Sequence, residues 1–324
     1  MTKQGIGHMS LEWDGRDNKE VLEDTEVSAE HKRKIRLIEK YKDYFYEYFK
    51  LDKKPIYGQT TFLKDTAVTY LVIASPKNEI KAVRHSFPFV GEFPYRGYFN
   101  KNDANAFMDE QEKLNLSTYM RPVYAYSTLD RTPFDDNILS SFFYYNDEQL
   151  AQLIFHELTH TIFFIEDEIS LNESLAEVIS DDLLISYFKR KQKDVDLIIL
   201  KQKKDEKIRE AISNLTKQLN LNYKRDKDYA KVLESFLEDK FYPTIESICK
   251  AQEIQKCWPL KNTWNNARFA AFSTYQTQQN FLKDLKTKLN LSSRDFLSLL
   301  QKEYAQFSKS DIDKTFKSYL IKRY

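Results

Sequence analysis

The stretch His156-Glu157-Leu158-Thr159-His160 constrains this chain more than any other part of its sequence. Two histidines four residues apart lie on one face of a helix, one turn apart, where a single metal ion can contact both imidazoles. Asn146 and Gln149 form a capping box ahead of an apolar run, and no Gly or Pro interrupts residues 147–165. The sequence therefore predicts a helix that presents two metal ligands. The alternative is a pair of histidines that only fill a core.

A carboxylate is the expected third ligand, because no histidine follows His160 in the chain. The acidic residues 166–168 fall in a charged turn, whereas Glu173 opens a second apolar-periodic helix that can pack antiparallel to the first. Two His and one Glu form a ligand set of catalytic zinc sites, so we expect one Zn²⁺ on His156, His160 and Glu173. Glu177, one turn beyond Glu173, either hydrogen-bonds the far nitrogen of a ligand histidine or is a solvated carboxylate.

Glu157 lies between the two histidines in sequence but is rotated off the helix face that carries them. This position suits a general base that takes the proton of a zinc-activated water. An intact Glu157 therefore favours a catalytic zinc site over a structural one.

These features resemble the gluzincin metallopeptidases, thermolysin among them. In that group the Glu that begins the second helix is the third ligand, and an acid four residues later supports a ligand His. Further segments are similar to a narrower group, the predicted zinc aminopeptidases of bacterial envelopes, over nearly the whole chain. These segments are Tyr95-Arg96-Gly97-Tyr98-Phe99, Ala125-Tyr126-Ser127-Thr128-Leu129, Phe134-Asp135-Asp136, the twelve residues between His160 and Glu173, and Asn265-Asn266-Ala267-Arg268. The chain departs from this group at Asp130–Pro133, where the family usually continues with Gly-Trp.

The expected fold is α+β and predominantly helical, of the gluzincin kind, with a small N-terminal sheet and a helical C-terminal half. The β-branched run Thr66–Ala74 predicts a strand, and the prolines and glycines of Pro88–Gly97 predict a loop. We expect residues 1–324 to form a single metallopeptidase unit. Its α/β portion would cover 1–145, and its helical portion with the zinc motif would cover 146–324.

The resemblance also implies where a substrate would bind. In gluzincins an edge strand ahead of the zinc helix pairs with the substrate backbone, and Tyr119–Thr128 is the predicted strand at that place. The candidate cleft residues are Tyr124, Tyr126 and Ser127. On the loop that follows, Asp135 and Asp136 either cap the next helix or meet the free amine of a substrate.

The helical half supplies the remaining candidates. Asn266 belongs to a segment that resembles the family and is a predicted substrate-binding residue. Tyr275, on the same predicted helix, is the first choice as the donor that stabilises the oxyanion. Tyr124, Tyr126 and Arg268 are the alternatives for that role.

The resemblance thus implies a zinc-dependent peptidase, with aminopeptidase as the first choice and a peptide as the substrate. Two other readings stay open: a zinc endopeptidase or oligopeptidase with the same chemistry, and a non-catalytic zinc-containing envelope binding protein. The balance of 50 Lys and Arg against 49 Asp and Glu gives no reason to expect a nucleic-acid partner. No stretch reaches the ~18 apolar residues of a membrane span. The sequence leaves the oligomeric state open.

Cys249 and Cys257 are the two cysteines of the chain. They either pair in an oxidising compartment or remain free thiols. The chain begins without the pattern of a signal peptide. Because the resembling family is usually exported, the expected location is the periplasm or cell envelope if such a peptide has been trimmed, and the cytoplasm otherwise.

Overall fold

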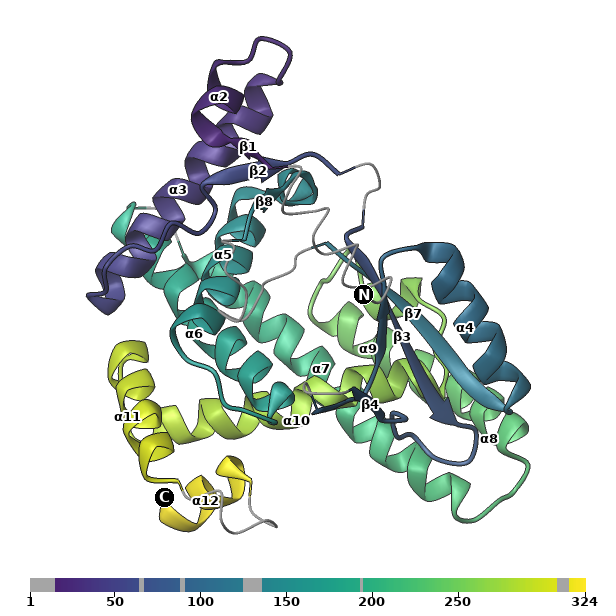
Figure 1. The fold of residues 1–324 in the computed structure, drawn as a ribbon. Helices are drawn as coiled ribbons and strands as arrows, with labels where there is room; N and C mark the ends of the chain where they lie inside the picture. Colours follow the sequence, from purple (N-terminus) through teal and green to yellow (C-terminus); the bar gives the residue numbers. More distant parts are fainter. Residues whose placement is uncertain (1–14, 64–66, 88–90, 125–135, 193–194, 308–314) are drawn as a thin grey trace. The chain divides into compact units, whose positions relative to one another are not determined.

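The computed structural model describes residues 15–63, 67–87, 91–124, 136–192, 195–307 and 315–324, without the side chains of 87, 91 and 275–280. It is predominantly helical, with 64% helix and small sheets, which confirms the predicted α+β class. The chain divides into two compact units that alternate along the sequence (Figure 1). Unit 1 comprises Met1–Thr69, Pro122–Lys193 and Gln278–Tyr324, and unit 2 comprises Tyr70–Arg121 and Asp194–Thr277. The expectation of one metallopeptidase unit over the whole chain stays a prediction.

Unit 1 begins with a short sheet and two helices, α2 (Asn18–Glu23) and α3 (Ala29–Phe49). Ser28 starts α3 by accepting a hydrogen bond from the His31 N–H, which satisfies one of the free donors of the first turn. The sheet has the order β1 (Arg16–Asp17), β2 (Gln59–Thr61) and β8 (Ile138–Leu139). Its parallel β2–β8 pair aligns Thr60 with Ile138 and leads through the 3₁₀ turn η1 (Ser140–Tyr144) into the next helix.

The two central helices of unit 1 are α5 (Asp147–Ile162) and α6 (Ile169–Arg190), which pack side by side (Figure 1). The predicted capping box is confirmed: the Asn146 side chain accepts from the Gln149 N–H and the Gln149 side chain accepts from the Asn146 N–H. Helix α3 packs on α5 through aromatic rings, with the centroids of Tyr41 and Phe155 6.0 Å apart. At the start of α5, Asp147 accepts hydrogen bonds from Arg33 at 2.8 Å and from buried Lys34 at 2.9 Å.

The C-terminal segment of unit 1 braces the connection between α5 and α6. It contains the end of α10 (Asn266–Lys288), together with α11 (Ser293–Gln306) and α12 (Phe316–Arg323). Tyr304 of α11 accepts a hydrogen bond from the Glu166 N–H at 3.1 Å. Glu168 accepts from the first N–H groups of α12, those of Phe316 and Lys317, and so caps that helix. The turn after α5 is therefore held by residues far away in sequence.

Unit 2 contains a three-stranded sheet of order β6 (Arg96–Tyr98), β3 (Thr69–Pro76) and β7 (Leu116–Val123). β3 pairs antiparallel with β6 and aligns Tyr70 with Tyr98, and α4 (Lys101–Lys113) packs on β6. The predicted loop over Pro88–Gly97 is wrong in part, because β5 (Gly91–Phe93) pairs with β4 (His85–Phe87) and Arg96 lies in β6. Prolines and glycines are a local signal for a loop. The strands form because other strands, at least in part outside this segment, pair with them.

The helical part of unit 2 is formed by α7 (Asp196–Tyr223), α8 (Tyr229–Phe236) and α9 (Tyr242–Ala251). A π-helical turn, η2 (Leu237–Phe241), joins α8 to α9, and a 3₁₀ turn, η3 (Trp258–Lys261), follows. Phe241 packs against Trp264 and Phe269 with ring centroids 4.9 and 5.2 Å away. This aromatic group belongs to a core that also contains Cys249 and Cys257, which form a disulfide.

Reduction of this disulfide is expected to lower the stability of unit 2 by about 2–3 kcal/mol. The bridge closes a short loop, with a sequence separation of 8, and a loop of that length accounts for a loss of chain entropy of this size. Thermal unfolding with and without a reductant measures the effect. The Cys249→Ser/Cys257→Ser variant serves as the control, because its Tm should not respond to reductant. Equal Tm values for the wild-type chain under both conditions would contradict the prediction.

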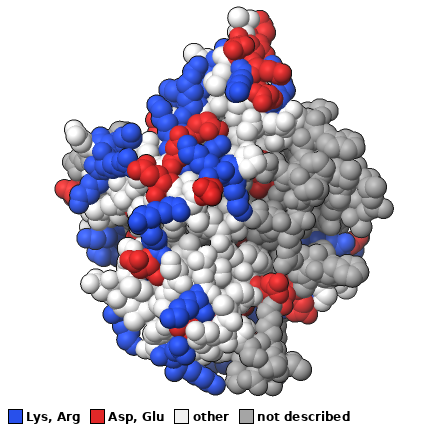
Figure 2. All heavy atoms as spheres, turned by 60° about the vertical axis from the view of Figure 1, so that its left-hand side comes forward, with Lys and Arg blue, Asp and Glu red and all other residues white. Residues whose placement is uncertain are grey.

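Charge is mixed over the surface. On the face in Figure 2, Lys and Arg side chains lie interspersed with Asp and Glu, in keeping with the formal net charge of +1. Among the residues that the structure describes, no helix combines the length and the apolar character needed to cross a lipid bilayer.

Candidate metal centre

Helices α5 and α6 bring three predicted ligands together in unit 1. The Nε2 atoms of His156 and His160 lie 3.3 Å apart. Glu173 reaches across from α6, with Oε2 3.5 Å from His156 Nε2 and Oε1 3.6 Å from His160 Nε2. Each side chain offers one ligand atom to a common point, and the group could hold a metal ion.

The centre opens to solvent on one side. The side chain of His160 is only 6% exposed, whereas those of His156 and Glu173 are 24% and 38% exposed. A cation could therefore enter from the side of Glu173 and rest against His160, which is enclosed by the packing of α5 against its neighbours.

Asn172 fixes the position of Glu173 on α6. Its side-chain amide makes two hydrogen bonds to the backbone of Ile165, accepting from the N–H at 2.8 Å and donating to the carbonyl at 2.7 Å. Asn172 is 2% exposed, so these bonds are shielded from water. The amide thereby closes the turn between the two helices and sets the register in which α6 presents the next residue to α5.

Burial and neighbouring charges give the two histidines different pKa values. Burial lowers the pKa of His156, but the hydrogen bond and charge of Glu173, with the charges of Glu157 and Glu177, raise it to about 9. Burial and the neighbouring charge of His156 lower the pKa of His160 to about 4, against the opposing effect of Glu173. The cluster thus attracts positive charge at His156 while His160 stays neutral, the form in which an imidazole binds a metal.

Glu157 projects from the same helix into a different environment. Burial raises its pKa to about 7; the charge of His156 opposes this shift, and the charges of Glu173 and Asp136 add to it. A carboxylate with a pKa near neutrality can both accept and release a proton at physiological pH. The helix α5 therefore carries two potential ligands and one potential proton carrier.

A family model described as "Putative aminopeptidase" matches residues 1–314 of the 324 in the chain. The chain belongs to this aminopeptidase family. No curated protein and no solved structure matches it. The family supports a peptidase, and the three convergent side chains of this aminopeptidase-family chain are its candidate metal ligands.

The structure locates some of the residues predicted to bind substrate in this aminopeptidase-family chain. Tyr124 follows the edge strand β7 and is 39% exposed, and its carbonyl accepts a hydrogen bond from Ser141 in η1, just before α5. Asp136 is 7% exposed and close enough to Glu157 for its charge to act on that carboxylate. The predicted residues Tyr126, Ser127 and Asp135 lie outside the described part of the chain, as does the side chain of Tyr275.

The structure gives Asn266 a packing role, and its predicted substrate-binding role stays a prediction. Asn266 is 1% exposed, accepts from the Tyr223 hydroxyl at 2.6 Å and donates to the Pro76 carbonyl at 2.8 Å. Both ends of its amide are thus used inside unit 2, where it ties α10 to α7 and to β3. Arg268, an alternative oxyanion donor, is held within unit 2 as well, by Asn262 at 2.7 Å and by the ring of Tyr119 4.6 Å away.

Glu177 lies where its charge raises the pKa of His156, as expected for an acid one turn beyond Glu173. Its predicted hydrogen bond to a ligand histidine stays a prediction. The sequence did not predict a part in the centre for two further residues, Asn172 and the buried Tyr57. For Asn172, the signal in the sequence is its position beside Glu173. Tyr57 lies in an irregular loop, where no periodic pattern marks a residue as part of a site.

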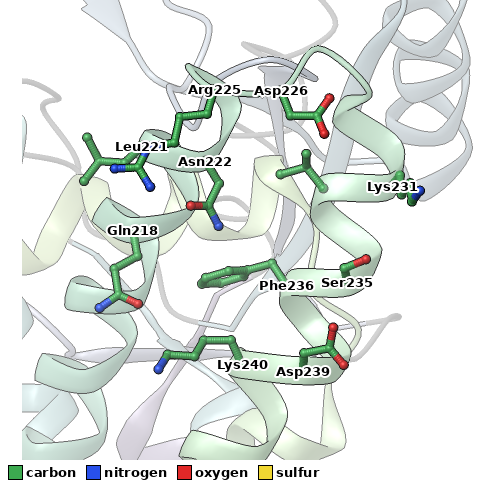
Figure 3. Close-up of a pocket in the computed structure, with 11 residues that line it drawn as sticks. Gln218, Leu221, Asn222, Arg225, Asp226, Lys231, Ser235, Phe236, Asp239 and Lys240 are labelled. Atoms are coloured by element: carbon green, nitrogen blue, oxygen red, sulfur yellow. The ribbon is translucent and has the colours of Figure 1, made fainter.

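Unit 2 contains a groove of about 630 Å³ between α7 and α8 (Figure 3). Asn222 on α7 and Phe236 on α8 point into it, and Arg225 and Lys240 lie at its margins. None of the candidate metal ligands lines this groove, and we assign it no part in the chemistry of the centre.

Proposed function

We propose that this chain is a zinc-dependent aminopeptidase with a gluzincin-like HExxH site, in which His156, His160 and Glu173 hold one Zn²⁺. The close approach of these three side chains carries the proposal. Atoms bound tetrahedrally to zinc at ~2.0–2.2 Å lie ~3.3–3.6 Å from one another. The two Nε2 atoms are 3.3 Å apart, and Glu173 places one carboxylate oxygen 3.5 Å from His156 and the other 3.6 Å from His160. One ligand atom from each residue lies within 4.8 Å of the others, which supports a shared metal ion.

The donor set supports zinc over magnesium and calcium. Two imidazoles and one carboxylate suit zinc, whereas magnesium and calcium prefer sites built from oxygen atoms. Three ligands from the described residues would leave a fourth position on zinc for water or substrate. Zinc bound there would polarise a peptide carbonyl and acidify a water molecule.

Glu157 is the general base of the proposed reaction. It takes a proton from the water that attacks the peptide carbonyl and passes it to the nitrogen of the leaving amine. Its half-buried position on α5 keeps its pKa near neutrality, so one carboxylate can serve both steps. The negative charges of Glu173 and Glu177 favour positive charge at His156, which supports the binding of a cation there.

Recognition of a free amino terminus is the exopeptidase part of the proposal. An ammonium group that leaves water needs a carboxylate or carbonyl partner. Asp136 supports this role, because it is a buried carboxylate in the electrostatic neighbourhood of Glu157. Family membership points to the same activity.

Paired peptides test the proposed function. The zinc-loaded chain should hydrolyse peptides with a free amino terminus. It should hydrolyse their N-acetylated forms at least ~10-fold more slowly, because the acetyl group removes the positive charge that Asp136 would bind. Equal rates on both forms would replace the aminopeptidase assignment with an endopeptidase or oligopeptidase. Zinc bound in stoichiometric amount without hydrolysis of any peptide would favour a zinc-containing binding protein.

We also propose that the chain works in an oxidising compartment of the cell envelope. The Cys249–Cys257 disulfide supports this location, because such bonds persist in the periplasm and are rare in the cytosol. Labelling of free thiols in fractionated cells tests it. Two alkylated cysteines in the native chain would contradict the proposal.

A further inference from the structure

Tyr57 is the least expected residue in the surroundings of Glu157. Its side chain is completely buried, and its hydroxyl has no hydrogen-bond partner within the described ranges of the chain. Removing a hydroxyl from water without giving it a partner is unfavourable, so a group of this kind calls for a physical reason.

The backbone of Tyr57 is strained as well. Its φ of 63° lies in the left-handed region, which bulky residues rarely occupy. Two hydrogen bonds keep it there: the Tyr57 N–H donates to the Asp136 carbonyl at 2.8 Å, and the Tyr57 carbonyl accepts from the Asn18 side chain at 2.8 Å. Strain that its surroundings enforce in this way occurs preferentially at functional sites.

The loop that carries Tyr57 contacts the C-terminal end of α5 and the turn that precedes this helix. Lys54 donates to the Thr161 carbonyl at 2.8 Å, near the C-terminal end of α5 and next to His160. The ring of Tyr57 meets that of Phe142, in the turn before α5, edge-on at a centroid distance of 6.1 Å. Thr161 lies four residues, about one helical turn, beyond Glu157, so the loop is held to α5 one turn from Glu157.

Tyr57 lies within electrostatic range of two carboxylates. Burial raises the pKa of Tyr57 well above its usual value, and among the charged groups that add to the shift Glu157 comes first and Asp136 second. A hydroxyl donates and a carboxylate accepts, so Glu157 is the natural partner for this unpaired group. Hydrogen bonds in an active site are often long before substrate binds and tighten in the complex.

We propose that Tyr57 is a positioning residue for Glu157: its hydroxyl donates to one carboxylate oxygen in the substrate complex and thereby aims the other oxygen at the attacking water. The inference rests on the proposed function, in which Glu157 is the general base. The strained backbone and the enclosed ring fix the hydroxyl in advance, so the hydrogen bond forms without ordering a mobile side chain.

The variant Tyr57→Phe tests the inference, because it removes the hydroxyl and keeps the ring. We expect kcat to fall about 10- to 100-fold, the size of effect that a misoriented catalytic group produces. KM and zinc content should stay within twofold of the wild type, and Tm should stay equal or rise because no hydrogen bond seen in the structure is lost. An unchanged kcat, or a loss that appears only in KM, would overturn the inference.

Tyr41→Phe is the matched control. Tyr41 is equally buried and contacts the same helix, but its hydroxyl donates to the Asp147 carbonyl at 3.0 Å, at the opposite end of α5 from the ligands. This variant should lose stability and keep kcat. A loss of kcat in Tyr41→Phe as large as that in Tyr57→Phe would mean that any disturbance of α5 has this effect, and would overturn a special role for Tyr57.

The double variant Tyr57→Phe/Glu157→Gln shows whether the tyrosine acts through the glutamate. If it does, adding Tyr57→Phe to Glu157→Gln should leave the residual rate unchanged within twofold. A further loss equal to that in the wild-type background would overturn the inference while leaving the proposed function standing. A zinc-loaded wild-type chain that hydrolyses no peptide would overturn both.

Discussion

Replacement of Glu157 by glutamine is expected to leave zinc in place and to lower kcat by about 10²- to 10⁴-fold, the contribution of a well-placed general base. Gln is nearly isosteric with Glu but cannot accept the proton of the attacking water. Glu157 does not belong to the convergent ligand group, so the variant should bind metal as the wild type does. Peptidase rates and metal content, measured on the same preparations, test both parts of the expectation.

Two outcomes would contradict this assignment. Loss of zinc from Glu157→Gln would make Glu157 a ligand, and an unchanged kcat would give the proton transfer to another group. Glu148→Gln is a suitable control, because it makes the same chemical change in the first turn of α5 and should affect neither rate nor metal content.

Replacement of a ligand is expected to lower activity about as much as Glu157→Gln does, but because zinc is lost. His160→Ala and Glu173→Gln each remove one of three protein ligands, and zinc content at micromolar metal should fall to a small fraction of that in the wild type. Activity should fall with it. For the wild-type chain, a chelator should abolish activity and added Zn²⁺ should restore it, with metal content and rate changing together.

His31→Ala is the matched control for the ligand variants. His31 lies on α3 in the same unit, where its ring stacks on Phe143 at a centroid distance of 4.7 Å, and it is not part of the ligand group. It should keep full zinc content. Retention of zinc by both ligand variants, or full activity after complete removal of metal, would refute the metal centre.

Zinc uptake should also release protons. The pKa of His156 stands at about 9 because Glu173 favours the protonated imidazole, so at neutral pH a metal ion must displace that proton. Apparent affinity should therefore rise as the pH increases from 6 toward 9. A pH-indicator dye in weak buffer records the released protons during a zinc titration.

Local signals predicted which three candidate ligands come together, because these residues are close in sequence. The capping box at Asn146 fixed the start of the helix, the spacing of the two histidines fixed their common face, and Glu173 lay at the start of the next apolar-periodic helix. What could not be predicted depends on contacts between distant segments. The loop that carries Tyr57 reaches α5 through Lys54, from about a hundred residues earlier in the chain, and no pattern in the sequence records that contact.

The contacts of Asn266 have the same origin. Its segment resembles that of a family, and a resemblance does not say what each residue does. The structure shows a buried amide with two hydrogen bonds that join α10 to its neighbours, and the predicted substrate-binding role of Asn266 stays a prediction. The short strands β5 and β6 were missed for a related reason, because prolines and glycines give a local signal for turns whereas strand pairing is decided elsewhere.

The alternation of the two units along the chain has a consequence for synthesis on the ribosome. The helices α5 and α6 emerge before unit 2 is complete, and the segment that holds their connection emerges after unit 2, because Glu168 contacts Phe316 and Glu166 contacts Tyr304. Until residues 304–317 have been translated, the connection between the ligand-bearing helices lacks these contacts. Deletion of this segment should therefore impair the maturation of a centre whose candidate ligands were translated much earlier.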